Sequence, residues 1–207
     1  MLYKNVIIRD NYMDKYIVDE MDKDYAYILS KVKDKVVMDI GANLGAFTKY
    51  SLLNGAKRVI AIEPELDNYT LLLLNSTDDV IPINAAVSMV SDEEVTLYVN
   101  SGNNKGLHTI MPDWLCSSRP DCTTQPISTI SIQYLLETYR PEVLKIDIEG
   151  GETIIAEVIK NLPDYVKYVA IEFDTISDTY LATIHGLLDS RFKDAQRNKF
   201  FTGSRDD

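Results

Sequence analysis

The sequence predicts a doubly wound α/β fold: a mostly parallel sheet covered by helices, with a terminal antiparallel hairpin. Two observations predict it. Short, uniformly apolar runs alternate with amphipathic helical stretches, an order typical of parallel strands with helices on both faces. The chain ends in a hairpin pattern over 192–201. The 207 residues fit one globular domain, predicted as a strand and helix extension over 1–35 followed by the main domain over 36–207.

The elements follow in order. An apolar strand over 36–40 ends at Gly41, and a helix over 46–53 is closed by the C-cap signal Asn54-Gly55. Pro64 suits the first turn of a helix over 65–75. Alternating apolar residues predict a half-buried strand over 94–99. The other predicted strands span 59–62, 80–84, 106–110, 143–148 and 168–173, and the other predicted helices span 18–32, 132–139, 151–161 and 179–190. The stretch 112–126 is predicted to be a surface loop.

Charge and composition exclude several classes of protein. There are 21 Lys and Arg against 32 Asp and Glu, a net charge of -11, so we expect no nucleic-acid partner held by phosphate neutralisation. The sequence has no signal-peptide pattern and no long apolar run, so we expect a cytoplasmic protein without membrane insertion. Cys116 and Cys122 are too few for a disulfide framework and lack companions for a zinc site.

The loop after the first core strand reads Asp39-Ile-Gly41-Ala-Asn43-Leu-Gly45. In open α/β sheets ligands bind beyond the carboxyl ends of the strands, where the strand order reverses. Gly41 and Gly45 permit a tight turn and close approach by a ligand. Asn43 replaces the second glycine of a dinucleotide fingerprint, and Asp39 disfavours a pyrophosphate. The ammonium and sulfonium of S-adenosylmethionine suit this loop better.

Two further strand ends complete an adenosyl pocket. The second strand ends at Glu63, whose carboxylate can accept hydrogen bonds from both ribose hydroxyls. The third ends at Asn84-Ala85-Ala86, where an amide can read adenine beside small residues. A fourth strand carries the segment Leu-Lys-Ile-Asp-Ile-Glu-Gly-Gly-Glu over 144–152, and two carboxylates at such a strand end are costly to bury without a role.

These segments, together with Ile62-Glu63-Pro64, resemble the FkbM family of S-adenosylmethionine-dependent methyltransferases from about 36 to 173. The Lys-Ile-Asp-Ile-Glu-Gly run is the most specific part. The segments 106–109 and 171–173 also look similar, and Gly150-Gly151-Glu152 departs slightly from the usual Gly-Ala-Glu. The resemblance implies a Rossmann-like class I methyltransferase fold, S-adenosylmethionine as cofactor, and O-methylation of a hydroxyl on a sugar, glycan or small metabolite.

The expected site residues follow from the strand ends and from the resemblance. The expected cofactor-binding residues are Asp39, Gly41, Asn43, Gly45, Glu63, Pro64, Asn84, Ala85 and Asp147. The candidate catalytic residues are Asp147, Glu149 and His108. Asp147 is the favoured base, and His108 is an alternative because imidazole titrates near neutral pH.

Several alternatives stay open. No metal is expected, although Asp147, Glu149 and Glu172 together offer oxygen ligands for a divalent cation. Four tyrosines near the N-terminus form either a substrate lid or part of the core: Tyr12, Tyr16, Tyr25 and Tyr27. The competing functions are a non-catalytic S-adenosylmethionine-binding module and an RNA ribose methyltransferase. Lys145 and Asp147 suggest the latter, and the acidic balance opposes it.

Overall fold

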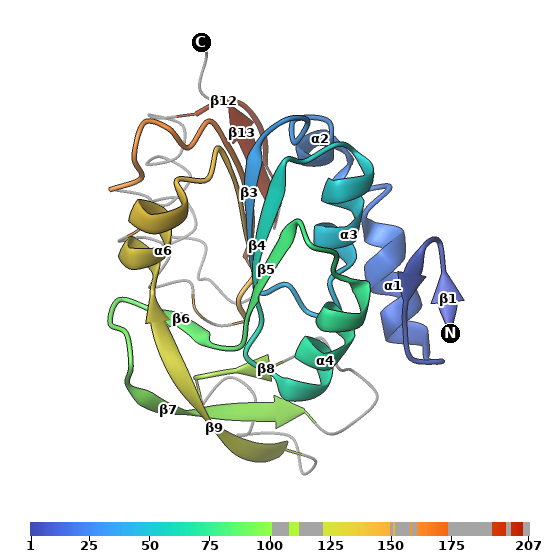
Figure 1. The fold of residues 1–207 in the computed structure, drawn as a ribbon, viewed down its shortest axis with the longest axis vertical. Coiled ribbons are helices and arrows are strands. Elements are labelled where there is room, and N and C mark those ends of the chain that lie inside the picture. The colour runs from blue at the N-terminus through green and yellow to red at the C-terminus, as the bar shows by residue number, and fades with distance from the viewer. Residues whose placement is uncertain are drawn as a thin grey trace.

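A computed structural model describes residues 1–100, 108–111, 122–149, 151, 158, 161–173, 192–197 and 200–204. At its centre is a seven-stranded sheet in the order β12-β13-β11-β10-β3-β4-β5 (Figure 1). The strands from β5 to β11 run parallel, whereas β13 lies antiparallel between β11 and β12. The doubly wound, mostly parallel sheet and the terminal antiparallel hairpin are thus confirmed.

The bounds of most elements agree with the predicted ones. The strands of the central sheet are β3 (Val36–Ile40), β4 (Arg58–Ile62), β5 (Val80–Ile83), β10 (Val143–Ile146), β11 (Tyr168–Glu172), β12 (Lys193–Arg197) and β13 (Phe200–Ser204). The helices predicted after the first strands and before β10 are α3 (Ala46–Leu53), α4 (Leu66–Asn75) and α6 (Ile132–Tyr139). The predicted helices over 151–161 and 179–190 lie almost entirely outside the described residues.

Alternate residues of the strands pack into two cores, one on each face of the sheet. Met38 and Ile40 face a cluster that includes Leu135 of α6. Val37 faces the other cluster, which contains Phe47 of α3 and apolar residues of the N-terminal segment. Figure 1 shows α6 on one side of the sheet and α1, α3 and α4 on the other. Since β3, β4 and β10 are buried on both faces, their sequences are mostly apolar.

The N-terminal segment differs from its prediction. It forms a hairpin of β1 (Leu2–Tyr3) and β2 (Val6–Ile7), followed by α1 (Tyr12–Glu20) and α2 (Ala26–Leu29). The single helix predicted over 18–32 is therefore wrong. The side chain of Asn11 accepts the N–H of Asp14 and starts α1 earlier. A turn over 21–25 then separates α1 from α2.

A second, four-stranded sheet lies below the carboxyl ends of the parallel strands (Figure 1). It contains β6 (Ala86–Ser88), β7 (Glu94–Asn100), β8 (His108–Thr109) and β9 (Cys122–Ser131). The predicted pairing of β7 with a strand near 106–110 is confirmed. The predicted loop over 112–126 is wrong from residue 122 onward, because β9 begins there. Cys122 is disulfide-bonded, although two cysteines are too few for a disulfide framework; Cys116 lies outside the described residues.

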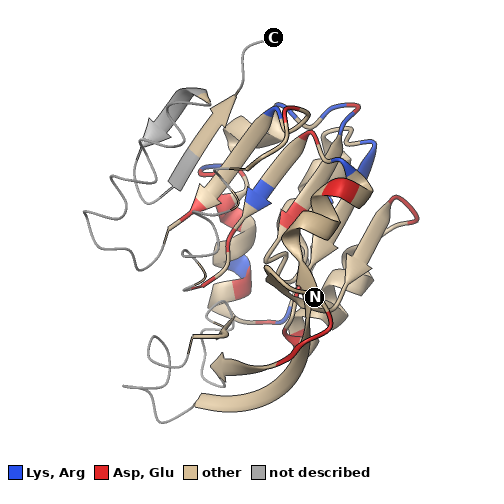
Figure 2. Cartoon of the chain, turned by 90° about the vertical axis from the view of Figure 1, so that its left-hand side faces the viewer, with Lys and Arg blue, Asp and Glu red and all other residues tan. Residues whose placement is uncertain are grey.

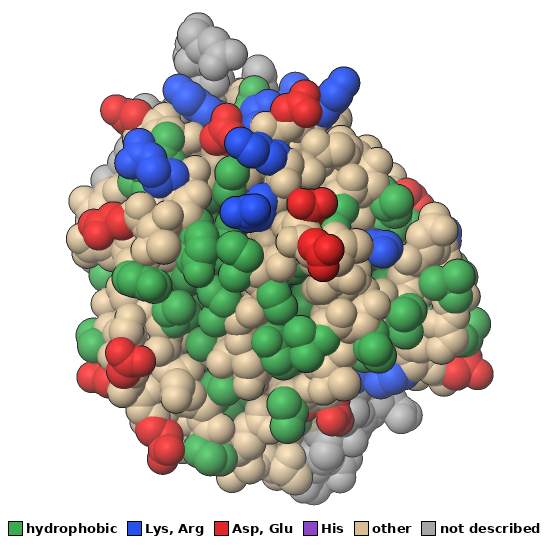
Figure 3. Space-filling view, viewed as in Figure 1, with side chains coloured by type: hydrophobic (Ala, Val, Ile, Leu, Met, Phe, Trp, Pro, Cys, Tyr) green, Lys and Arg blue, Asp and Glu red, His purple; other side chains and the backbone are tan. Residues whose placement is uncertain are grey.

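Charges are distributed unevenly over the fold. Figure 2 shows them mostly at strand ends and in connections, with most of each strand uncharged. On the face shown in Figure 3, Lys and Arg gather at the top, where the parallel strands begin. Lys35 precedes β3, and Arg58 is the first residue of β4. Among the described residues, no helix combines the length and apolar character that a membrane span requires.

Candidate active site

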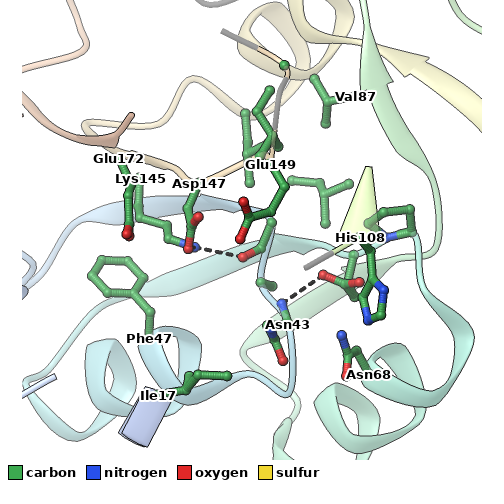
Figure 4. A pocket seen from close by; sticks show the side chains of 18 of the residues that line it. Ile17, Asn43, Phe47, Asn68, Val87, His108, Lys145, Asp147, Glu149 and Glu172 are labelled. Carbon is green, nitrogen blue, oxygen red and sulfur yellow. Dashed lines mark hydrogen bonds and ion pairs between the residues drawn. The ribbon is translucent and has the colours of Figure 1, made fainter. Parts of the chain in front are cut away.

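A pocket of about 280 Å³ lies at the carboxyl ends of the parallel strands (Figure 4). Its floor comes from the ends of β3, β4 and β10, at the point where the strand order reverses. Helix α1 supplies Met13, Ile17 and Glu20 on one side. The second sheet supplies Leu97 and His108 on another. The pocket therefore lies where the strand order predicts a ligand.

Glu63 ties the end of β4 to the loop after β3. Its two carboxylate oxygens accept the backbone N–H groups of Asn43, at 2.8 Å, and Glu65, at 2.9 Å. Burial raises the pKa of Glu63 to about 7, although these two N–H groups act in the opposite direction. Glu63 lines the pocket, as do Pro64 and Ala85. Their roles toward a ribose and an adenine stay predictions.

Gly41 and Gly45 have φ values of +75° and +84°, a region that glycine enters without strain. A Cβ on Gly41 would lie 1.7 Å from the backbone oxygen of Asp147, and one on Gly45 would lie 2.8 Å from Leu72. These glycines therefore allow the chain to pack against itself. Close approach by a ligand is not needed to explain them.

Asn84 is not among the residues that line the pocket. Its side-chain amide donates to the backbone oxygens of Glu63, at 2.9 Å, and Pro64, at 3.0 Å. The amide thus braces the ends of β4 and β5. Asn68 of α4 lines the pocket instead, and the strand-end pattern gave no signal for it.

Asp39 lies beneath the pocket rather than in its lining. Its side chain is completely buried, accepts the Thr48 hydroxyl at 2.7 Å and lies 3.3 Å from Lys145 Nζ. Lys145 also donates to the backbone oxygen of Gly41. Burial lowers the pKa of Lys145, but the charges of Asp147 and Asp39 outweigh this and raise it above its ordinary value. Lys145 is therefore a fixed cation between two carboxylates.

Asp147 follows β10, and only one of its two carboxylate oxygens, Oδ2, has partners among the described residues. Its Oδ2 lies 3.1 Å from Lys145 Nζ and 3.5 Å from the hydroxyl of Tyr25. In the part of the chain that the structure describes, Oδ1 has no partner. The side chain lines the pocket and is 28% exposed. Asp147 thus presents one carboxylate oxygen that can take a proton or a hydrogen bond.

The other carboxylates of the pocket come from three elements. Glu149 follows Asp147, Glu172 ends β11, and Glu20 ends α1. Burial and the charge of Asp147 raise the pKa of Glu20 to about 7. The sequence reasoning missed Glu20, because the end of α1 was placed inside a longer helix. No group of three or more His, Cys, Asp or Glu side chains is arranged for a metal ion within the described ranges.

His108 lies apart from the other two catalytic candidates, and only two of the four N-terminal tyrosines line the pocket. His108 is buried on β8, and its Nδ1 accepts the N–H of Asn100 at 3.3 Å. Figure 4 shows it on the side of the pocket with Asn43 and Asn68, away from Lys145 and Asp147. Among the four tyrosines, Tyr16 and Tyr25 line the pocket, and Tyr12 and Tyr27 do not. Of the three catalytic candidates, Asp147 and Glu149 lie together.

The fold and the pocket define a Rossmann-like α/β protein with its ligand site beyond the carboxyl ends of its strands. The chain matches the methyltransferase FkbM domain over residues 39–178, more than half of its length. It belongs to this family, as the Lys-Ile-Asp-Ile-Glu-Gly segment predicted.

Hexuronic acid methyltransferase AglP of Haloferax volcanii is 27% identical to the chain over 143 residues. The alignment covers 68% of this chain and 56% of that protein, so the chain spans little more than half of the relative's length.

Solved structures agree on the class of fold. A ribosomal protein L11 methylase from Lactobacillus delbrueckii subsp. bulgaricus has a TM-score of 0.50 at 13% identity, covering 91% of this chain and 80% of its own. A putative RNA methyltransferase from Pyrococcus horikoshii has a TM-score of 0.50 at 14% identity, and the match covers 99% of this chain and 90% of that chain. At these identities the likeness shows the fold alone, which is that of class I methyltransferases.

Proposed function

We propose that this protein is an S-adenosylmethionine-dependent O-methyltransferase that acts on a hydroxyl of a sugar, glycan or small metabolite. The observation that carries the proposal is the pattern of contacts that the Asp147 carboxylate makes in the pocket. One of its oxygens is held by Lys145, and the other has no partner among the described residues. A carboxylate arranged in this way suits the removal of a proton from an acceptor hydroxyl.

The pocket suits the cofactor in its charge and in its donor set. S-adenosylmethionine supplies a methyl group on a sulfonium leaving group. Among the described lining residues, Lys145 is the one Lys or Arg, whereas five carboxylates line the pocket: Glu20, Glu63, Asp147, Glu149 and Glu172. Such a lining favours a ligand with a sulfonium and an ammonium. We expect Glu63 to accept from ribose hydroxyls, and Pro64 and Ala85, which also line the pocket, to contact the base.

The chain contributes by positioning and by proton transfer. The strand order β10-β3-β4 places Asp147 on one side of the loop after β3 and Glu63 on the other. An acceptor held beside Asp147 would lose its hydroxyl proton to Oδ1, and bound S-adenosylmethionine would supply the methyl group for the acceptor oxygen. The sugar-acid methyltransferase among the relatives supports a glycan acceptor.

Two measurements test the proposal. Calorimetry should show binding of S-adenosylmethionine and S-adenosylhomocysteine, with much weaker binding of NADH. Transfer of a labelled methyl group should then be measured on a panel of hydroxylated mono- and oligosaccharides, with the Asp147→Asn variant as control. Tighter binding of NADH than of S-adenosylmethionine would overturn the cofactor assignment. Binding without transfer to any hydroxyl compound would favour a non-catalytic module.

A further inference from the structure

We propose that Tyr25 is a positioning residue of the active site. Together with Lys145, its hydroxyl holds Oδ2 of Asp147, so that Oδ1 stays available to the acceptor. The inference rests on the proposed function, in which Asp147 accepts the proton of the acceptor. It assigns a role in the reaction to the N-terminal segment, outside the residues that match the family.

The sheet brings the partners of Tyr25 to one face. Lys145 and Asp39 are register partners on adjacent parallel strands, so their side chains lie on the same face. Asp147 follows Lys145 by two residues. Ala170 is the register partner of Lys145 on β11, and Glu172 follows it by two residues. Both carboxylates therefore leave the sheet on the face that the N-terminal segment covers.

Tyr25 reaches these carboxylates from the turn between α1 and α2. The residue is 2% exposed, and its ring packs against Phe47 with 5.5 Å between centroids. The hydroxyl lies 3.1 Å from Oε2 of Glu172 and 3.5 Å from Oδ2 of Asp147. The Lys145 ammonium lies 5.9 Å from the centre of the same ring. A core aromatic residue thus presents its polar end to the pocket.

The hydroxyl is a permanent donor at this place. Burial, followed by the charges of Asp147 and Glu172, raises the pKa of Tyr25 well above its ordinary value. A tyrosine hydroxyl has one proton, and Tyr25 shares it between Oε2 of Glu172, at 3.1 Å, and Oδ2 of Asp147, at 3.5 Å. Tyr25 therefore stands between two carboxylates that would otherwise face each other with like charge.

Removal of this hydroxyl leaves Asp147 with fewer hydrogen-bond donors and the same number of neighbouring carboxylates. The titratable groups that face it are Lys145 from its own strand, Glu172 from β11, Glu20 from α1, and Tyr25. Without Tyr25 Oη, Lys145 is the one donor left to Oδ2 among the described residues, while Glu20 and Glu172 still repel the carboxylate. Repulsion of the Asp147 carboxylate should therefore grow, and its orientation should loosen.

Tyr25→Phe tests the proposal, because it keeps the ring and removes the hydroxyl. Tyr27→Phe is the matched control, since Tyr27 lies on α2 and does not line the pocket. In the cofactor-free protein, the carboxyl ¹³C signals of Asp147 and Glu172 should be titrated by NMR. We expect at least one of the two midpoints to rise by about one pH unit in Tyr25→Phe and neither to move in Tyr27→Phe.

Activity supplies the second measurement. In Tyr25→Phe, kcat should fall about tenfold, the KM for the acceptor should change little, and the acid limb of the kcat/KM profile should move to higher pH. Binding of S-adenosylhomocysteine should stay near that of the unmodified protein. A folded Tyr25→Phe variant with unchanged carboxyl titrations would overturn the inference. Failure of the unmodified protein to bind S-adenosylhomocysteine would overturn the proposed function instead, and the titrations would still test the contact.

Discussion

The Glu63 carboxylate accepts the backbone N–H of Asn43 at 2.8 Å, so the acid at the end of β4 holds the loop that follows β3. Its other oxygen accepts the N–H of Glu65, at the start of α4. One side chain thus fixes the relative positions of two strand ends and a helix at the edge of the pocket. Any ligand that hydrogen-bonds Glu63 meets a carboxylate that is already immobilised.

Glu63→Gln should weaken the binding of S-adenosylmethionine about 10- to 100-fold. An amide nitrogen replaces one of the two acceptor oxygens, which weakens the hydrogen bonds to the ribose by about 1–3 kcal/mol in total. It also turns a donor toward the N–H of Asn43 or Glu65 and so loosens the loop after β3. Calorimetry measures the change. Glu65→Gln is the control, because the Glu65 side chain caps α4 and does not line the pocket. Unchanged affinity in a folded Glu63→Gln variant would place the ribose elsewhere.

Cofactor affinity and stability should change with pH in opposite directions. Folding raises the pKa of Glu63 from its ordinary value of 4.5 to about 7, mainly by burial. The ionised carboxylate is the better hydrogen-bond acceptor, so affinity should rise between about pH 6 and 8. Stability from this group is fully present below pH 4.5 and is lost as the pH rises through about 7. Calorimetry between about pH 6 and 8 checks the affinity, and urea unfolding between pH 4.5 and about 7 checks the stability.

Glu63→Gln identifies the group responsible for that pH dependence. The variant does not titrate at this position, so its affinity should be nearly independent of pH over the same range. Glu20 has a pKa raised to about 7 as well, but lies on α1. A slope that persists in Glu63→Gln and disappears in Glu20→Gln would assign the titration to Glu20.

The central sheet could be predicted from the sequence because its strands are buried on both faces. Val36–Ile40 and Val143–Ile146 are buried almost throughout, so a mostly apolar run, broken only by Asp39 and Lys145, marks each of them. β9 gave no such signal. Its first half is largely exposed and polar, and its pairing with β7 is a long-range contact. The loop prediction failed at Cys122 for that reason.

The site residues that could be predicted from the sequence are those that directly follow a strand. Glu63 and Asp147 follow apolar strands, and parallel strands bring their carboxyl ends to one edge. The contact between Lys145 and Asp39 depends on strand register, which apolar patterns alone do not give. Tyr25 depends on the path of the turn over 21–25. The sequence around Tyr25 is equally typical of a core residue, and the Tyr25 ring does lie in the core.

Asp147→Asn should lower the methyl-transfer rate about 10²- to 10⁴-fold while cofactor affinity changes little. The amide keeps the shape and can still accept from Lys145, but it cannot take a proton. Glu149→Gln is the matched control in the same pocket lining. A parallel loss of rate and affinity would make Asp147 a cofactor ligand. A near-normal rate for Asp147→Asn, with a large loss for Glu149→Gln, would transfer the role to Glu149.

Thr48→Val should lower the free energy of unfolding by about 1–3 kcal/mol, because it leaves a buried carboxylate with one fewer donor. Thr48 and Asp39 are both completely buried, and the hydroxyl donates to Oδ2 at 2.7 Å. Urea unfolding measures the change. Thr70→Val is the control, since that exposed hydroxyl donates only to the backbone oxygen of Leu66, and it should change stability by less than about 0.5 kcal/mol. A Thr48→Val variant as stable as the unmodified protein would mean that Lys145 alone satisfies Asp39.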